Sequence, residues 1–109
     1  MNEFPESDWK LLRELQPVAL ERLCSRILSQ VSRQCDSTGQ TSHQRYLKVF
    51  SLVEEGDHDI ARAFNNPRRS AAFMRLTAMR SQGLITDGEL LRFTAATRSR
   101  IKALEGGAR

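Results

Sequence analysis

The side chains of this sequence that could hold a metal ion are few and widely spaced. His43 and His58 lie 15 positions apart, on different sides of the helix that the surrounding residues predict, so they form no two-histidine metal motif. Glu54 and His58 are four positions apart and could form a metal pair, but this spacing is also that of an ordinary solvated pair on a helix. We expect neither a metal ion nor a cofactor.

The patterns that mark enzyme families lack their supporting motifs. Ser7 with Lys10, and Ser99 with Lys102, fit the S-x-x-K pattern of certain acyl-transfer enzymes, but the companion motifs of those enzymes are absent. The sequence also has no phosphate-binding or dinucleotide-binding glycine loop, no H-E-x-x-H and no C-x-x-C. We therefore expect a non-catalytic protein. The alternative, an enzyme, would need a cleft that gathers Asp57 or the histidines.

The two cysteines, Cys24 and Cys35, fall on the apolar face of one predicted helix. A rise of about 1.5 Å per residue places them roughly 16 Å apart, which is too far for a disulfide bond. We expect two buried, unreactive thiols.

Positive charge is concentrated toward the C-terminus. Residues 1–66 hold eight Lys or Arg against ten Asp or Glu, whereas residues 67–109 hold nine against three. This basic part could bind nucleic acid, an acidic partner or the acidic half of the same chain. The candidate basic surface consists of Arg68, Arg75, Arg80, Arg98, Arg100 and Lys102.

The overall composition predicts one globular domain over residues 1–109, with frayed ends at residues 1–6 and 105–109. The first residues are acidic and lack the basic start and apolar run of a signal peptide. No segment approaches the roughly 20 apolar residues of a membrane helix. We expect a cytoplasmic protein without a membrane partner.

Hydrophobic periodicity predicts helices and no strands. Ser7 is a suitable N-cap for a first helix over residues 8–15. Pro17 disfavours helical geometry at the residue before it and suits the first position of a new helix, so a second helix is expected over residues 17–35. Its apolar residues fall within an arc of about 140°, as in an amphipathic helix.

A third helix is expected over residues 42–65. Thr41 and Gln44 form a capping box at its start, and its apolar face keeps its phase across Gly56. The alternative is a break at Gly56, with Asp57 as a new N-cap.

If the third helix is continuous, Asp57 projects from the middle of its apolar face. A lone buried carboxylate is costly, so we expect a structural ion pair with Arg68 or Arg69. The alternative role for Asp57 is to bind a ligand or a metal ion.

Two further helices are expected in the C-terminal half. Asn66 and Pro67 suit the N-cap and first position of a helix over residues 67–82, and Thr94 suits the N-cap of the last helix. Apolar residues occupy two sides of the helix over residues 67–82, which indicates that it packs between neighbours or at a subunit interface.

Between these two helices, the segment G-L-I-T-D-G-E-L predicts a helical hairpin. Gly83 supplies a left-handed helix stop, and Thr86 with Glu89 forms a capping box for a short helix that ends near Phe93. Residues 73–93 thereby resemble the short C-terminal helical hairpins of many bacterial proteins, and this resemblance implies a hairpin rather than an activity.

The same hairpin is poorly suited to reading DNA as a helix-turn-helix. Met79 stands where the two helices of that motif touch and a small residue is usual. Asp87 and Glu89 stand at the start of the following helix, where a carboxylate would repel phosphate.

The chain as a whole resembles small all-helical bacterial proteins, with no known activity, that carry S-D-W-K and P-V-A-L-E-R-L segments early and a G-L-I-T-D-x-E-L-x-R-F segment late. We predict an all-α fold, a five- or six-helix orthogonal bundle with a C-terminal αα-hairpin. The expected function is that of a protein-interaction or accessory module that forms a homo-oligomer through the apolar faces of its third and fourth helices. The alternative is a protein that binds nucleic acid non-specifically through its basic half.

Overall fold

Residues 4–107, the part of the chain that the computed structural model describes, form five α-helices and one 3-10 turn. No strand occurs in this part, so the prediction of an all-α fold is confirmed. The elements are α1 (Glu6–Cys35), α2 (Ser42–Phe64), the 3-10 turn η1 (Arg69–Ala71), α3 (Ala72–Ser81), α4 (Asp87–Leu90) and α5 (Ala95–Gly107).

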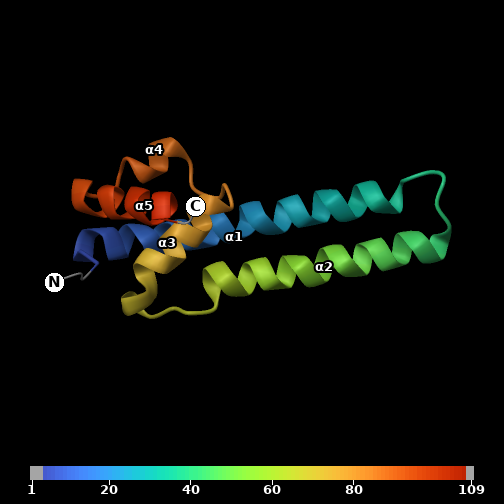
Figure 1. The fold of residues 1–109 in the computed structure, drawn as a ribbon, viewed down its shortest axis with the longest axis horizontal. Helices are drawn as coiled ribbons and strands as arrows, with labels where there is room; N and C mark the ends of the chain where they lie inside the picture. The colour runs from blue at the N-terminus through green and yellow to red at the C-terminus, as the bar shows by residue number, and fades with distance from the viewer. Residues whose placement is uncertain (1–3, 108–109) are drawn as a thin grey trace.

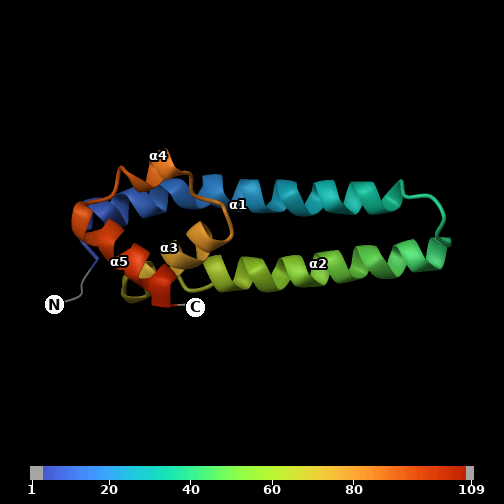
Figure 2. The same cartoon turned by 45° about the horizontal axis from the view of Figure 1, so that its top comes forward.

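The two long helices extend well beyond the other three. α1 and α2 run antiparallel and side by side in both views, while α3, α4 and α5 gather around the N-terminal half of α1 (Figures 1 and 2). We call residues 20–62 the arm and the rest of the described chain the head. The radius of gyration is 16.7 Å, against about 13 Å for a compact domain of this length. The described part of the molecule is therefore more elongated than an ordinary globular domain.

The first two predicted helices are one helix. α1 begins at Glu6, directly after Pro5, and continues past Pro17 to Cys35, so the predicted cap at Ser7 and the predicted break at Pro17 are both wrong. Pro17 cannot donate a hydrogen bond to the carbonyl of Arg13, but both residues are exposed, so water can reach this position. Buried residues on the opposite side of the helix hold it to the head on both sides of the proline.

α2 is continuous, and its start is as predicted. The Thr41 hydroxyl accepts a hydrogen bond from the Gln44 amide at 3.0 Å, and the Gln44 side chain accepts one from the Thr41 amide at 2.9 Å. Gly56 is buried where α2 crosses α1, and a Cβ atom there would lie 2.6 Å from Cδ1 of Ile27. The glycine therefore allows close contact between helices, and the alternative of a break at this position is wrong.

The fourth helix begins later than predicted. Residues 66–68 are not helical, Asn66 accepts a hydrogen bond from the Arg68 amide at 3.3 Å, and α3 starts only at Ala72, after η1. Here Arg69 turns toward the N-terminal segment and donates to the Phe4 carbonyl at 3.1 and 2.7 Å and to Glu6 at 2.6 Å.

The ends of the described chain are more ordered than predicted. Phe4 is buried, and its ring lies 4.9 Å from that of Phe73, while Glu6 already belongs to α1. Residues 105–107 are part of α5. The predicted fraying is therefore wrong for residues 4–6 and 105–107, and residues 1–3 and 108–109 lie outside the described residues.

The C-terminal hairpin has the predicted turn. Gly83 has a φ of 73°, and the Leu84 amide donates to the Met79 carbonyl at 2.9 Å, which together make a Schellman helix end. The Thr86 hydroxyl and the Glu89 side chain form the expected capping box, with hydrogen bonds of 3.0 and 2.9 Å. Leu84 and the residue after it are buried, so the turn also packs on the core.

One buried carboxylate joins the two ends of the head. Asp8 of α1 is 1% exposed and lies at the N-terminus of α5. It accepts hydrogen bonds from the Thr94 amide (3.0 Å), the Thr94 hydroxyl (2.7 Å) and the Thr97 hydroxyl (2.5 Å). A negative charge at a helix N-terminus is favourable, so Asp8 stabilises the start of α5.

Candidate functional site

The predicted ion pair of Asp57 is wrong. Asp57 is exposed, and none of the ion pairs found among the described side chains includes it. Arg68 is exposed and Arg69 binds Glu6 and the Phe4 carbonyl instead. The reason is the position of Asp57 on α2, beside the line of residues that faces α1 rather than within it.

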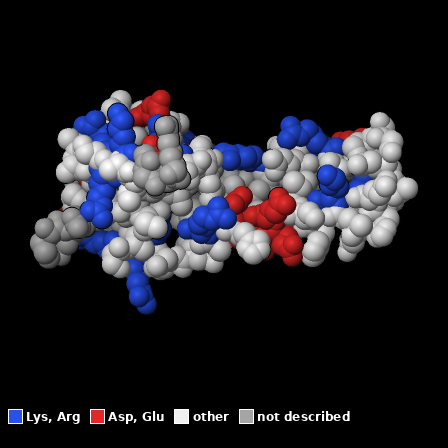
Figure 3. Space-filling model, in the orientation of Figure 1, with Lys and Arg blue, Asp and Glu red and all other residues white. Residues whose placement is uncertain are grey.

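Only some of the residues predicted to form the basic surface are exposed. Arg80 donates to the Ile85 carbonyl at 2.7 Å and pairs with Asp87. Arg98 is half-buried and donates to the Phe93 carbonyl at 3.2 Å, and Arg100 lies over the ring of Phe73. Arg68 and Lys102 are exposed. Basic side chains are visible over the head in Figure 3, together with acidic ones, and a group of acidic side chains lies midway along the visible side of the arm.

Arg75 is not on the surface at all, so its prediction as part of the basic surface is wrong. It is 2% exposed, and its Nε and Nη1 atoms have no hydrogen-bond partner among the described residues. Its guanidinium lies 6.0 Å from the ring of Trp9, and burial lowers its pKa.

Replacement of Arg75 by methionine is expected to stabilise the protein. Methionine fills a similar volume without a buried charge, so we expect the free energy of unfolding to rise by about 1 kcal/mol. Thermal unfolding followed by circular dichroism measures this change, with Arg92→Met as an exposed control that should have little effect. A loss of stability in Arg75→Met would show that the guanidinium has an essential partner.

Half of the exposed large apolar side chains of the described residues lie on one side of the arm. We call this side the arm face. Four of its large side chains are well exposed, namely Leu28 (66%), Tyr46 (65%), Phe50 (57%) and Val53 (48%). The arm face consists of Leu20, Cys24, Leu28, Val31 and Cys35 on α1 and of Tyr46, Val49, Phe50, Val53, Asp57 and Ile60 on α2.

A shallow groove of about 280 Å³ runs between α1 and α2 on the arm face. Cys24 and Leu28 line it from α1, and Val53 and Asp57 line it from α2. Asp57 is the charged residue of the arm face on α2, and on α1 the exposed Glu21 lies beside Leu28 at the end nearer the head. The opposite side of the arm is polar, because Arg26, Gln30, Glu55 and Asp59 line the cleft between the same two helices there.

The residues considered for catalysis or metal binding do not come together. Within residues 4–105, no group of three or more His, Cys, Asp or Glu side chains could hold a metal ion. The groove that contains Asp57 is lined by neither His43 nor His58. Cys24 is half-buried but Cys35 is exposed, so the prediction of two buried thiols is wrong for Cys35.

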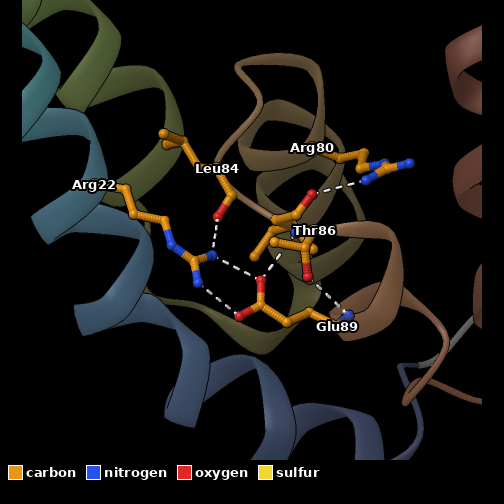
Figure 4. Close-up of polar contacts among 6 residues, drawn as sticks. Arg22, Arg80, Leu84, Thr86 and Glu89 are labelled. Atoms are coloured by element: carbon orange, nitrogen blue, oxygen red, sulfur yellow. Dashed lines mark hydrogen bonds and ion pairs between the residues drawn. The ribbon is translucent and has the colours of Figure 1, made fainter.

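A polar contact that the sequence did not reveal fastens the arm to the C-terminal hairpin. Arg22 of α1 donates to both carboxylate oxygens of Glu89, at 2.7 and 2.9 Å, and to the Leu84 carbonyl at 2.8 Å (Figure 4). Arg80 lies on the other side of the turn, so the turn is held between two arginines (Figure 4). One turn further along α1, Arg26 donates to the Gln82 carbonyl at 2.8 Å.

The pKa of the Glu89 carboxyl is lowered to about 2, chiefly by the hydrogen bonds from Arg22. Hydrogen bonds from Thr86 also contribute to this lowering, while burial acts in the opposite direction. In the sequence, Arg22 belongs to the P-V-A-L-E-R-L segment and Glu89 to the G-L-I-T-D-G-E-L segment. Two segments that are far apart in the sequence therefore meet in space through this contact.

No helix in the described part of the chain combines the length and the hydropathy that a membrane crossing requires. Comparisons with protein-family models, with curated protein sequences and with solved structures find no match for this chain.

Proposed function

We propose that this protein is a non-catalytic protein-interaction module and that the arm face is its binding surface. The observation that carries the proposal is the exposure of Leu28, Tyr46, Phe50 and Val53 side by side on one face. With 150–250 Å² for an aromatic side chain, their exposed parts amount to roughly 500 Å², close to the largest patch on an ordinary monomer. Such a patch is typical of an interaction surface.

These side chains are not needed to hold the arm together. α1 and α2 contact each other through a different line of residues, which includes Leu23 and Ile27 on α1 and Gly56 on α2. The arm face lies beside this line. Its exposed residues therefore add little to the internal packing of the arm, and this supports a role in binding.

The state of the arginines supports protein binding over nucleic-acid binding. A phosphate-binding surface needs several free guanidinium or ammonium groups on one side of the molecule. Arg75 is buried, Arg80 is paired with Asp87, and Arg98 is bonded to a backbone carbonyl.

Site-specific photo-crosslinking tests the proposal. A benzophenone amino acid would be placed at Phe50 of the full chain, inside the producing cell, and at Ser51 as the control. The two positions are adjacent in sequence, but Ser51 lies about 100° further round the helix, outside the arm face. We expect protein adducts from position 50 and few from position 51. Equal yields from both positions, or no adduct from position 50, would refute the arm face as a binding surface.

A further inference from the structure

We propose that the partner of the arm face is the arm face of a second copy of this chain, reversed about a twofold axis. This inference rests on the proposed function and names its partner. In a twofold interface, if residue i of one copy meets residue j of the other, then j also meets i. When a helix packs antiparallel against its own copy in this way, its contacting residues must therefore be spaced symmetrically on either side of one central point.

The exposed residues of the arm face on α2 have this symmetric spacing, and we call them the α2 stripe. Tyr46, Phe50, Val53 and Asp57 are separated by four, three and four positions, so they are symmetric about the point between residues 51 and 52. At about 100° per residue all four fall within an arc of roughly 60°. A reversed copy would therefore place its Val53 on Phe50 and its Asp57 opposite Tyr46.

The two exposed residues of the arm face on α1 are placed about the same centre. Gly56 of α2 packs against Ile27 of α1, which fixes the residues of the two antiparallel helices that lie at the same height. By this register, the centre of the α2 stripe lies level with the point between residues 31 and 32 of α1. Leu28 and Cys35, which lie on the arm face, are symmetric about that same point. A reversed copy would place its Cys35 on Leu28.

The chemistry of the paired positions is complementary. Asp57 is the one charged residue among the four exposed arm-face residues on α2, and the phenolic hydroxyl of Tyr46 can donate a hydrogen bond to a carboxylate oxygen. Both side chains are exposed in the single copy. Within one chain they are separated by about 16 Å along the helix, so they can meet only between copies.

The size of the arm also fits this arrangement. The centre lies close to the middle of α2 (Ser42–Phe64), so nearly the whole helix would lie against its equivalent, over about 30 Å. The tip of each arm would end level with the start of the other head. Four exposed side chains supply roughly 500 Å² from each copy, and the half-buried residues beside them bring the total toward the 800 Å² per partner of a stable interface.

Sedimentation equilibrium of the purified full chain tests the pairing. We expect a dimer at micromolar concentration, and Phe50→Glu should weaken it by about 100-fold while the helix content by circular dichroism is unchanged. Leu47→Glu is the matched control: Leu47 is 48% exposed on α2 but lies outside the arm face, so dimerisation should be unaffected. A dimer that is insensitive to Phe50→Glu would overturn the proposal.

A charge exchange tests the register. Tyr46→Glu would place a carboxylate opposite Asp57 of the second copy and should weaken the dimer by about 10-fold through repulsion of like charges. Adding Asp57→Lys should restore the dimer, because the two substituted side chains that face each other would then carry opposite charges. Failure of this rescue would overturn the twofold register. If the chain stays monomeric but position 50 still forms crosslinks to a different protein, self-pairing is refuted and the proposed function stands. Without crosslinks at position 50, both fail.

Discussion

Replacement of Asp8 by alanine is expected to lower the free energy of unfolding by about 3 kcal/mol. The Asp8 carboxylate is 1% exposed and accepts three hydrogen bonds from Thr94 and Thr97. Alanine would leave the hydroxyl of Thr97, which is 1% exposed, and the partly buried Thr94 amide without this acceptor. Urea unfolding followed by circular dichroism at pH 7 measures the change.

Two other variants separate the role of the hydrogen bonds from that of the charge. Asp8→Asn keeps the shape and one acceptor oxygen, so its loss should be smaller than that of alanine. Glu21→Ala removes an exposed carboxylate from the same helix and should change stability by less than about 0.5 kcal/mol. If Asp8→Ala were as mild as Glu21→Ala, the head would not depend on the contact between α1 and α5.

Replacement of Glu89 by glutamine is expected to cost about 2 kcal/mol at pH 7 and little near pH 2. The pKa of the Glu89 carboxyl is lowered from 4.5 to about 2, chiefly by its hydrogen bonds from Arg22. A carboxyl with a lowered pKa in the folded state stabilises the protein above its unfolded pKa. That contribution is lost as the pH falls through about 2.

Urea unfolding of the wild type and of Glu89→Gln at several pH values between 7 and 2 measures this difference. The two curves of stability against pH should converge at the acidic end. Glu14→Gln is the matched control, because Glu14 is an exposed carboxylate 3.8 Å from Arg92 and should contribute little. A constant difference between wild type and Glu89→Gln at every pH would show that the loss comes from packing rather than from the ion pair.

Local signals in the sequence predicted the features that depend on local geometry. The Thr41 and Thr86 capping boxes and the Gly83 helix stop each involve residues within a few positions of one another, and all three are present. The break predicted at Pro17 is wrong, because a proline ends a helix only where nothing else holds the helix together. Burial of α1 against the head on both sides of Pro17 outweighs the lost hydrogen bond.

The contacts that hold the head together join residues far apart in the sequence. Asp8 and Thr97 are 89 positions apart, and Arg22 and Glu89 are 67 apart. A single sequence contains no local sign of such pairs. The amphipathic pattern of α2 was read correctly as an apolar face, but the pattern cannot tell whether that face is covered by the same chain or by another. In the structure the stripe of Tyr46 and Phe50 is left uncovered by the described residues.

The helix α1 belongs to both the arm and the head, and these two parts require different lengths of chain before they can fold. The arm needs only the first 64 residues, because α1 and α2 pack as consecutive helices joined by a short loop. The head needs residues up to at least Ile101, which is buried in its core. Contacts between nearby segments form faster than contacts that close a long loop. During synthesis the arm is therefore expected to form while the head is still incomplete, with its apolar side exposed in the nascent chain from the start.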